Sequence, residues 1–393
     1  MSQTHSKPVA TWIGLAAGFC ALASVAQAEP GVTKDTIKIG AFGPLTGAVT
    51  MYGYPILNGP TAVFNRVNDE GGINGRKIEV VYEDDGCDAA KTRAAVKKLI
   101  FSHEVFMING GTCSASVYAA RDEFNDNKVP LMVVATVLDK ISDPMTRYIF
   151  TTTQPASRDG EVMVNFALSK PGVKRVAIVR HTDDWADAHV QSIYKGLKAA
   201  DVEIVADVAL ERNSSDATTQ VLKINEQKPD FVFFVTYPNE SAVFLRDAKK
   251  YGLTGPFIGA SSNMDLLAVA ERAGGLDAIA NAYVSSYLAD PVGSPEIGPE
   301  VDNYKKYYPK DKVQTLTFYG TSSAYAVVEA LRRAGPDLTR EKFVTALESL
   351  KDVPAGPAYC KITFSNTNHQ GCLDGTVWTV RDGKVVAIGP KWK

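Results

Sequence analysis

Short apolar runs alternate with amphipathic stretches along most of the chain, and this alternation constrains the fold more than any other feature. The first apolar runs cover residues 37–42, 77–84, 104–108 and 130–134. The pattern then restarts, with runs at 175–180, 203–210, 231–235, 256–260 and 282–287. Apolar strands followed by amphipathic helices are typical of a parallel sheet with helices on both faces. We therefore predict an α/β fold with two lobes, each a doubly wound, mainly parallel sheet flanked by helices.

The two sets of strands meet near residues 148–157, and helical stretches after residue 300 follow the second set. If these late helices return to the first lobe, the chain crosses between the lobes more than once, which favours a hinge and a cleft. The sequence closes with a hairpin turned by Asp382-Gly383. We expect lobe 1 to comprise residues 29–153 and 286–356, and lobe 2 to comprise residues 154–285 and 357–393.

The N-terminal residues have the pattern of an export signal. His5 and Lys7 precede an apolar run over residues 12–25, and "AQA" before Glu29 is a small-x-small cleavage site. A membrane anchor is the alternative interpretation, but the run is shorter than the roughly 20 apolar residues that a spanning helix needs. We expect residues 1–28 to be a signal peptide that is cleaved after Ala28.

Export makes the cysteines informative. Once Cys20 is removed with the signal, Cys87, Cys113, Cys360 and Cys372 remain, an even number in an oxidising compartment. Cys87 and Cys113 each follow a strand, and adjacent parallel strands would bring them within bridging distance; Cys360 and Cys372 flank one short segment. The alternative, a metal site, lacks the paired cysteine spacing of zinc sites. We expect the disulfides Cys87–Cys113 and Cys360–Cys372.

The remaining composition and motifs favour binding without chemistry. A net charge of −2 over 393 residues gives no electrostatic case for nucleic acid as a partner. The histidines lack the H-E-x-x-H spacing, "GGTCSAS" is not G-x-S-x-G, and the glycine-rich loops lack the lysine of a P-loop. We therefore expect neither an enzyme nor a protein with a metal or cofactor.

Ligands of doubly wound sheets bind at the carboxyl ends of the strands. One such loop, "GGTCSAS", leads into a helix whose free N–H groups, with the hydroxyls of Thr112 and Ser114, would form a seat for a carboxylate. The alternative interpretation is plain N-capping of that helix by Thr112 or Ser114.

The segment over residues 68–88, "NDEGGINGRKIEVVYEDDGCD", together with "IKIGAFGPLTGAVTMYG" and "GGTCSAS", resembles the solute-binding proteins of branched-chain amino acid ABC transporters. The resemblance runs over essentially the whole chain after residue 28. It implies a periplasmic, two-lobed clamshell of type I that closes on a small ligand and docks on a membrane permease. It also implies a monomer in the periplasm.

The resemblance assigns roles to particular positions. It supports the Cys87–Cys113 pairing and implies that the hydroxyl of Ser114 meets the ligand carboxylate. The ligand contacts that it implies are Tyr52, Ser114, Val134 or Ala135, Thr136, Trp185 (where a tyrosine is usual) and Tyr237.

One position departs from the family pattern. Amino-acid binders of this family hold the ligand ammonium with an acidic residue in the loop after the "F-x-G" strand, whereas here that loop places Ser261 or Ser262 there. A buried ammonium without a counter-charge costs several kcal/mol, although Asp159 or Glu240 could substitute. The sequence thus predicts an aromatic or apolar carboxylate ligand without an α-amino group. The alternatives are an amino-acid binder and a ligand sensor of the same fold.

Overall fold

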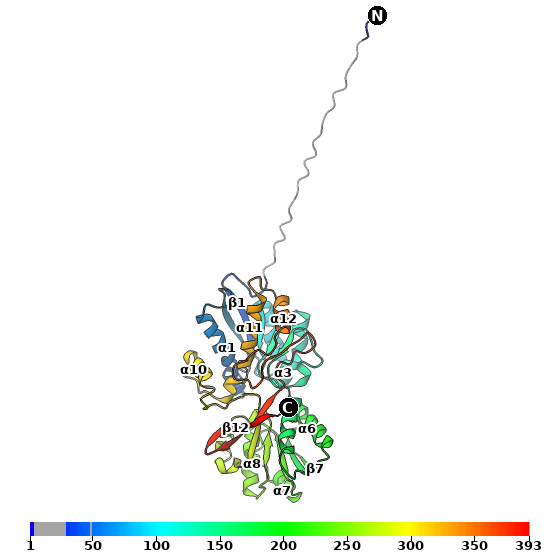
Figure 1. Ribbon diagram of the computed structural model, residues 1–393, viewed down its shortest axis with the longest axis vertical. Coiled ribbons are helices and arrows are strands. Elements are labelled where there is room, and N and C mark those ends of the chain that lie inside the picture. Colours follow the sequence, from blue (N-terminus) through cyan, green and yellow to red (C-terminus); the bar gives the residue numbers. More distant parts are fainter. Residues whose placement is uncertain (4–28, 48, 393) are drawn as a thin grey trace.

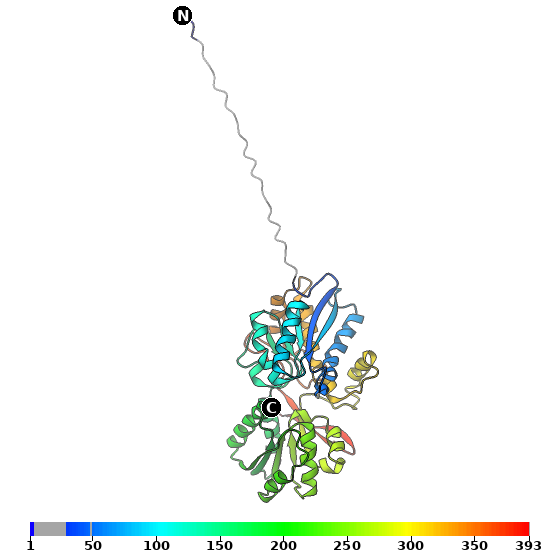
Figure 2. The same ribbon diagram turned by 180° about the vertical axis from the view of Figure 1, so that it is seen from behind.

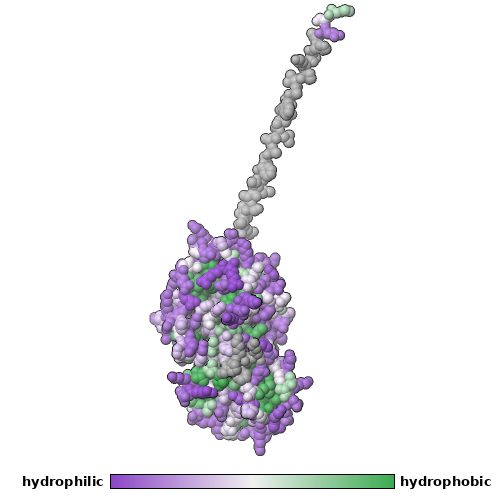
Figure 3. Space-filling model, viewed as in Figure 1, coloured by the Kyte–Doolittle hydropathy of each residue, from purple (hydrophilic) through white to green (hydrophobic). Residues whose placement is uncertain are grey.

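The computed structural model describes residues 1–3, 29–47 and 49–392, and it divides into an upper and a lower lobe (Figure 1). The predicted signal peptide, residues 1–28, falls almost entirely outside the described residues. In the described part of the chain each lobe is built on one sheet with helices on both sides, so the predicted α/β class is confirmed. Hydrophilic side chains cover most of the face seen in Figure 3.

The first sheet is parallel and has the order β2-β1-β3-β4-β5. Its strands are β1 (Thr36–Gly43), β2 (Lys77–Asp84), β3 (Met107–Gly110), β4 (Leu131–Val133) and β5 (Ile149–Thr151). The inner strands β3 and β4 and the edge strand β5 are buried at every residue. Such fully apolar strands need helices on both faces of their sheet.

The second sheet has the order β12-β11-β10-β9-β8-β6-β7. Its strands are β6 (Arg175–Arg180), β7 (Glu203–Ala209), β8 (Phe231–Val235), β9 (Phe257–Gly259), β10 (Ala282–Ser286), β11 (Gly375–Arg381) and β12 (Lys384–Trp392). β6 to β10 run parallel, whereas β11 and β12 form the predicted hairpin, in which Arg381 pairs with Lys384 across Asp382 and Gly383. Both turn residues have positive φ, which is the backbone conformation of this hairpin type.

Helices surround both sheets. In lobe 1 they are α1 (Tyr54–Asp69), α2 (Ala89–Lys97), α3 (Ser114–Ala119), α4 (Arg121–Asp126), α10 (Gly298–Tyr307), α11 (Thr321–Ala334) and α12 (Arg340–Glu348). In lobe 2 they are α5 (Ala156–Leu168), α6 (Asp184–Ala199), α7 (Thr218–Glu226), α8 (Pro238–Lys250) and α9 (Leu266–Arg272). Short helical turns connect them: η1 (Thr50–Tyr52), η2 (Lys98–Ser102), η3 (Asp139–Ile141), η4 (Ser261–Asn263), η5 (Leu276–Ile279) and η6 (Thr315–Phe318).

The late helices return to the first lobe, where α1 packs against α10, α11 and η6 (Figures 1 and 2). The chain therefore passes from lobe 1 to lobe 2 after β5, returns after β10 and passes again before β11. Just ahead of β11, Gln370 bridges to Thr151 and Phe364 packs edge-on against Phe150 of β5. The expected division of the chain at residues 153, 285 and 356 stays a prediction.

Both expected disulfides are present. Cys87 and Cys113 are joined with their Cα atoms 5.6 Å apart, and Cys360 and Cys372 with theirs 5.7 Å apart. The Cys87–Cys113 disulfide joins the loop between β2 and α2 to the residue just before α3.

The contact between α1 and η6 depends on Gly59, which lies inside α1. A Cβ at this position would overlap the carbonyl oxygen of Thr317 and lie 2.6 Å from the Oγ1 of Thr321. The bare backbone of Gly59 thus lets the late part of the chain close onto the first lobe.

Gly59→Ala tests this contact, because helix propensity predicts a higher free energy of unfolding and packing predicts a lower one. Alanine is the better helix former by about 1 kcal/mol, but the clash is expected to lower the free energy of unfolding by about 2 kcal/mol net. Urea denaturation measures the difference, and Gly298→Ala, where no atom lies within 4 Å of the added Cβ, is the control. An unchanged or raised free energy of unfolding for Gly59→Ala would show that the contact between α1 and η6 has room for a Cβ.

Candidate functional site

A cavity of about 280 Å³ lies between the lobes, and both lobes supply its wall. This volume is near the lower end of the range for small-molecule sites, ~300–1,000 Å³. The described wall residues of lobe 1 are Val49, Tyr52, Ile56, Cys87, Thr112, Cys113, Ser114, Ala115, Ser116, Ala135, Val137, Leu138, Leu316 and Tyr319. Those of lobe 2 are Asp183, Asp184, Trp185, Arg212, Tyr237 and Ser262.

Ser114 is the polar centre of the lobe 1 wall. It is the first residue of α3, the N-cap is Cys113, and no side chain caps the helix, so the N-capping interpretation was wrong. The first turn closes between the Val117 amide and the Cys113 carbonyl, at 3.0 Å, which leaves the amides of residues 114–116 without acceptors inside the helix. The Thr136 hydroxyl donates to the Ser114 Oγ at 2.6 Å. The proton of the Ser114 hydroxyl is therefore available to a ligand.

Aromatic rings form the lobe 2 wall. Trp185, in the first turn of α6, stacks on Tyr237 with ring centroids 4.5 Å apart. The guanidinium of Arg212 lies 4.5 Å from the centroid of the Tyr237 ring. Tyr52, from lobe 1, lines the same cavity, and burial raises the pKa of its hydroxyl to about 12. The tyrosines of the wall are thus neutral at physiological pH.

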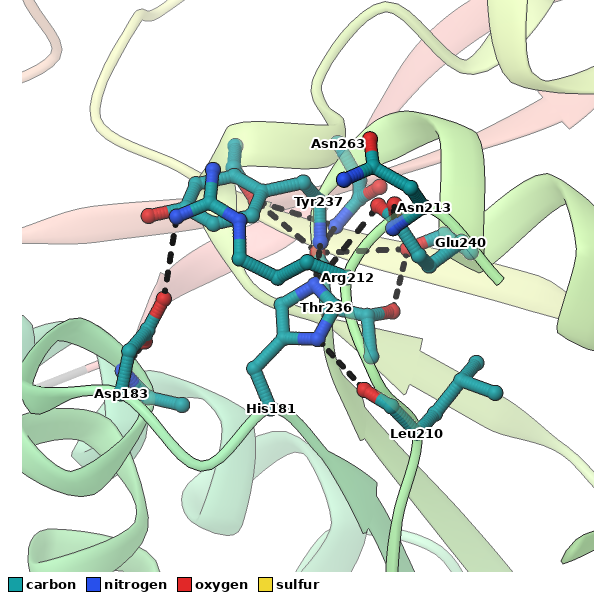
Figure 4. A network of polar contacts seen from close by, with 12 residues as sticks. His181, Asp183, Leu210, Arg212, Asn213, Thr236, Tyr237, Glu240 and Asn263 are labelled. Carbon is teal, nitrogen blue, oxygen red and sulfur yellow. Dashed lines mark hydrogen bonds and ion pairs between the residues drawn. The ribbon is translucent and has the colours of Figure 1, made fainter.

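Polar contacts behind Tyr237 fix the lobe 2 loops (Figure 4). His181 Nδ1 donates to the carbonyl of Leu210 at 2.7 Å, and its Nε2 accepts the amide of Tyr237 at 3.1 Å. Glu240 accepts the amide of Asn213 at 2.7 Å. Burial tends to raise the pKa of the Glu240 carboxyl, but His181 and the Asn213 amide outweigh it and hold that pKa below its usual value. Glu240 is therefore a bound carboxylate behind the wall.

Asp159 forms a second buried network. It lies in α5 and is fully buried, and it accepts hydrogen bonds from His189 at 3.1 Å, from the Ser261 amide at 2.9 Å and from the hydroxyl of Ser285. Burial tends to raise its pKa, but these hydrogen bonds lower it overall. His189 also contacts the Trp185 carbonyl at 2.8 Å, so Asp159 fixes α6, η4 and the end of β10 together.

The structure brings most of the predicted ligand contacts to one cavity. Tyr52, Ser114, Ala135, Trp185 and Tyr237 all line it. The remaining predicted contacts lie outside the described wall: Val134 packs beside Gly320, Thr136 supports Ser114 from behind, and Ser261 is held by Asp159 while its neighbour Ser262 faces the cavity.

Several wall residues were missed by sequence reasoning. Arg212 follows the carboxyl end of β7, so the rule that selected the loop before Ser114 could have found it. Leu316 and Tyr319 come from η6 and the residue after it, in a segment with no strand before it to point at the cleft. No local signal in the sequence marks these two.

The sequence pattern of the periplasmic binding protein family matches residues 36–384. The chain belongs to this family. The binding protein is 27% identical over 254 residues to the leucine-, isoleucine-, valine-, threonine- and alanine-binding protein of Pseudomonas aeruginosa. The aligned residues cover 64% of this chain and 68% of that relative.

Solved structures share the fold of this binding protein. The substrate-binding protein LivJ of Streptococcus pneumoniae, solved with isoleucine, gives a TM-score of 0.78 at 22% identity, over 91% of this chain and 100% of that one. A fatty acid ABC transporter substrate-binding protein from Thermomonospora curvata also gives 0.78 at 22% identity, over 93% and 94%.

The chain is thus a periplasmic binding protein of the branched-chain amino acid ABC transporter type, as its sequence resemblance predicted. Binding proteins of this family take up small ligands and deliver them to ABC transporter permeases; its homologues and its fold are those of substrate-binding proteins and not of enzymes. Among the described residues no helix is long and apolar enough to cross a membrane.

Asp159→Asn is expected to lower the free energy of unfolding at pH 7 by about 3 kcal/mol, because it removes one partner of a buried pair. Since the folded-state pKa of Asp159 lies below its unfolded value of about 3.9, this contribution is present above that value. It is lost as the pH falls through the folded pKa.

Urea denaturation from about pH 7 down to about pH 3 measures the free energy of unfolding of Asp159→Asn and of the unchanged protein. The difference between the two free energies should become smaller below about pH 4. The control is Asp201→Asn, at an exposed turn with positive φ that asparagine tolerates. A difference that does not depend on pH would contradict the assigned role of the carboxylate.

Proposed function

We propose that this binding protein captures a small carboxylic acid without an α-amino group, with an aromatic or apolar body, and delivers it as a monomer to a membrane permease. The observation that carries the proposal is the position of the buried carboxylates. Asp159 and Glu240, which could replace the missing ammonium partner, are both held by hydrogen bonds of their own and lie outside the cavity wall.

The carboxylates that do reach the wall do not make an ammonium site either. Asp183 caps α6 through the Ala186 amide at 3.0 Å and contacts Arg212 at 3.4 Å. Asp184 is exposed to solvent at the start of α6. An ammonium in the cavity would therefore be desolvated without a buried counter-charge, which costs several kcal/mol.

The rest of the wall suits a carboxylate on an apolar body. The Ser114 hydroxyl and the amides of residues 114–116 are donors that a carboxylate can accept. The wall also contains the apolar side chains of Ile56, Val137 and Leu138 from lobe 1, and lobe 2 supplies Trp185 as a stacking surface. The protein from Thermomonospora curvata is the substrate-binding protein of a fatty acid ABC transporter, so an acid without an amine has a parallel on this fold.

A thermal-shift screen tests the ligand class. The purified protein is unfolded and refolded to remove bound ligand and is then offered each amino acid beside the acid that lacks its amine, such as phenylalanine and phenylpropanoate. A ligand at a hundred times its Kd stabilises by about 2.7 kcal/mol, which raises the Tm by a few degrees. We expect only the amine-free acids to raise it. A shift with leucine or phenylalanine instead would establish an amino-acid binder.

Ser114→Ala tests the carboxylate seat. The variant removes one hydrogen bond to a charged group, so the Kd for an amine-free acid should rise about tenfold or more. Titration calorimetry measures the Kd, and Ser102→Ala, on the exposed surface of the same lobe, is the matched control. Equal affinities for Ser114→Ala and the unchanged protein would place the carboxylate elsewhere.

A further inference from the structure

Arg212 and Asp183 form a mixed-charge pair on the lobe 2 wall. The guanidinium lies 3.4 Å from a carboxylate oxygen of Asp183, and both side chains line the cavity. Among the described wall residues Arg212 is the only one with a cationic side chain. Ser114 lies on the wall of the other lobe, so a ligand that spans the cavity from one lobe to the other can contact both Ser114 and the pair.

The pair is held in place from several sides (Figure 4). The backbone is fixed before and after Arg212: two residues before it, the Leu210 carbonyl accepts from His181, and directly after it, the Asn213 amide donates to Glu240. The guanidinium lies over the ring of Tyr237, at 4.5 Å from its centroid. Asp183 is fixed by its cap on α6. These contacts fix the backbone around Arg212 and the side chain of Asp183, while 55% of the Arg212 side chain stays exposed to solvent and accessible to a ligand.

The pair offers N–H donors and a carboxylate acceptor side by side. A hydroxyl group matches both, because it accepts from the guanidinium and donates to the carboxylate. A second carboxylate on the ligand could only accept, and it would face the like charges of Asp183 and Asp184. An apolar end would leave the pair without a partner where ligand excludes water.

We propose that the ligand carries a hydroxyl group at the end remote from its carboxylate and that the Arg212–Asp183 pair selects for it. The substrate class is then hydroxylated aromatic acids. This inference rests on the proposed function for its carboxylate end, but the preference for a hydroxyl can be measured separately.

Titration calorimetry on the refolded protein tests it with matched ligands: phenylpropanoate and its para-hydroxy derivative, cinnamate and para-hydroxycinnamate, phenylalanine and tyrosine, and terephthalate as a diacid. The hydroxylated member of each acid pair should bind about tenfold more tightly or better, the value of a hydrogen bond to a charged group. In Arg212→Gln this preference should fall to about onefold.

Two further variants sharpen the comparison. Asp183→Asn keeps a capping side chain on α6 and should reduce the hydroxyl preference. Arg175→Gln removes another arginine of lobe 2, one that pairs with Glu203 at 2.9 Å outside the cavity wall, and should leave every affinity unchanged.

Equal affinities within each acid pair, tighter binding of terephthalate, or a preference that survives in Arg212→Gln would each overturn the inference. If only the amino acids bind, the proposed function fails; the comparison of tyrosine with phenylalanine then still decides whether the pair selects for a hydroxyl.

Discussion

The parallel direction of neighbouring strands places the functional loops of each lobe at one edge of its sheet, and the cavity lies where two such edges face each other. Ser114 follows β3, Ala135 follows β4, and Trp185 and Tyr237 follow β6 and β8. These residues are far apart in the sequence. They meet because the hydrogen-bonded register of each sheet fixes where its strands end.

Buried charge then fixes the lobe 2 edge. Asp159 joins α5, α6, η4 and β10 through its three hydrogen bonds. This carboxylate contacts Ser261, the position at which the sequence resemblance implies an acidic residue in amino-acid binders, but it accepts the Ser261 amide from outside the cavity wall. The charge of Asp159 therefore supports the architecture of the site. The surface presented to a ligand combines hydroxyls, aromatic rings, aliphatic side chains, Asp184 and the Arg212–Asp183 pair.

Local sequence was sufficient for much of the site. Fully apolar strands predicted the two sheets, Asp382-Gly383 predicted the hairpin, and the loop after one strand led to Ser114. The family resemblance, and not the local pattern, supplied Trp185 and Tyr237. It was insufficient where a residue's place depends on a distant segment. Gly59 and η6 meet across more than half of the chain, and Tyr319 reaches the cavity only because α1 accepts η6 at that contact. Ser114 likewise depends on a distant residue: the hydroxyl of Thr136 donates to its Oγ, which leaves the Ser114 proton free to be donated to a ligand.

The sequence by itself determined the class of this protein: two α/β units, paired cysteines and loops suited to binding without catalysis. These follow from periodicity and residue chemistry, which are local. Only the tertiary structure decided which charges face the ligand. Hydrogen bonds from residues distant in sequence hold Asp159 and Glu240 outside the cavity wall. Hydrogen bonds of the same kind hold the backbone around Arg212, whose side chain lines the wall. The sequence cannot distinguish a charged side chain that faces the ligand from one that is held outside the cavity wall. The difference depends on which hydrogen-bond partners the fold places around that side chain.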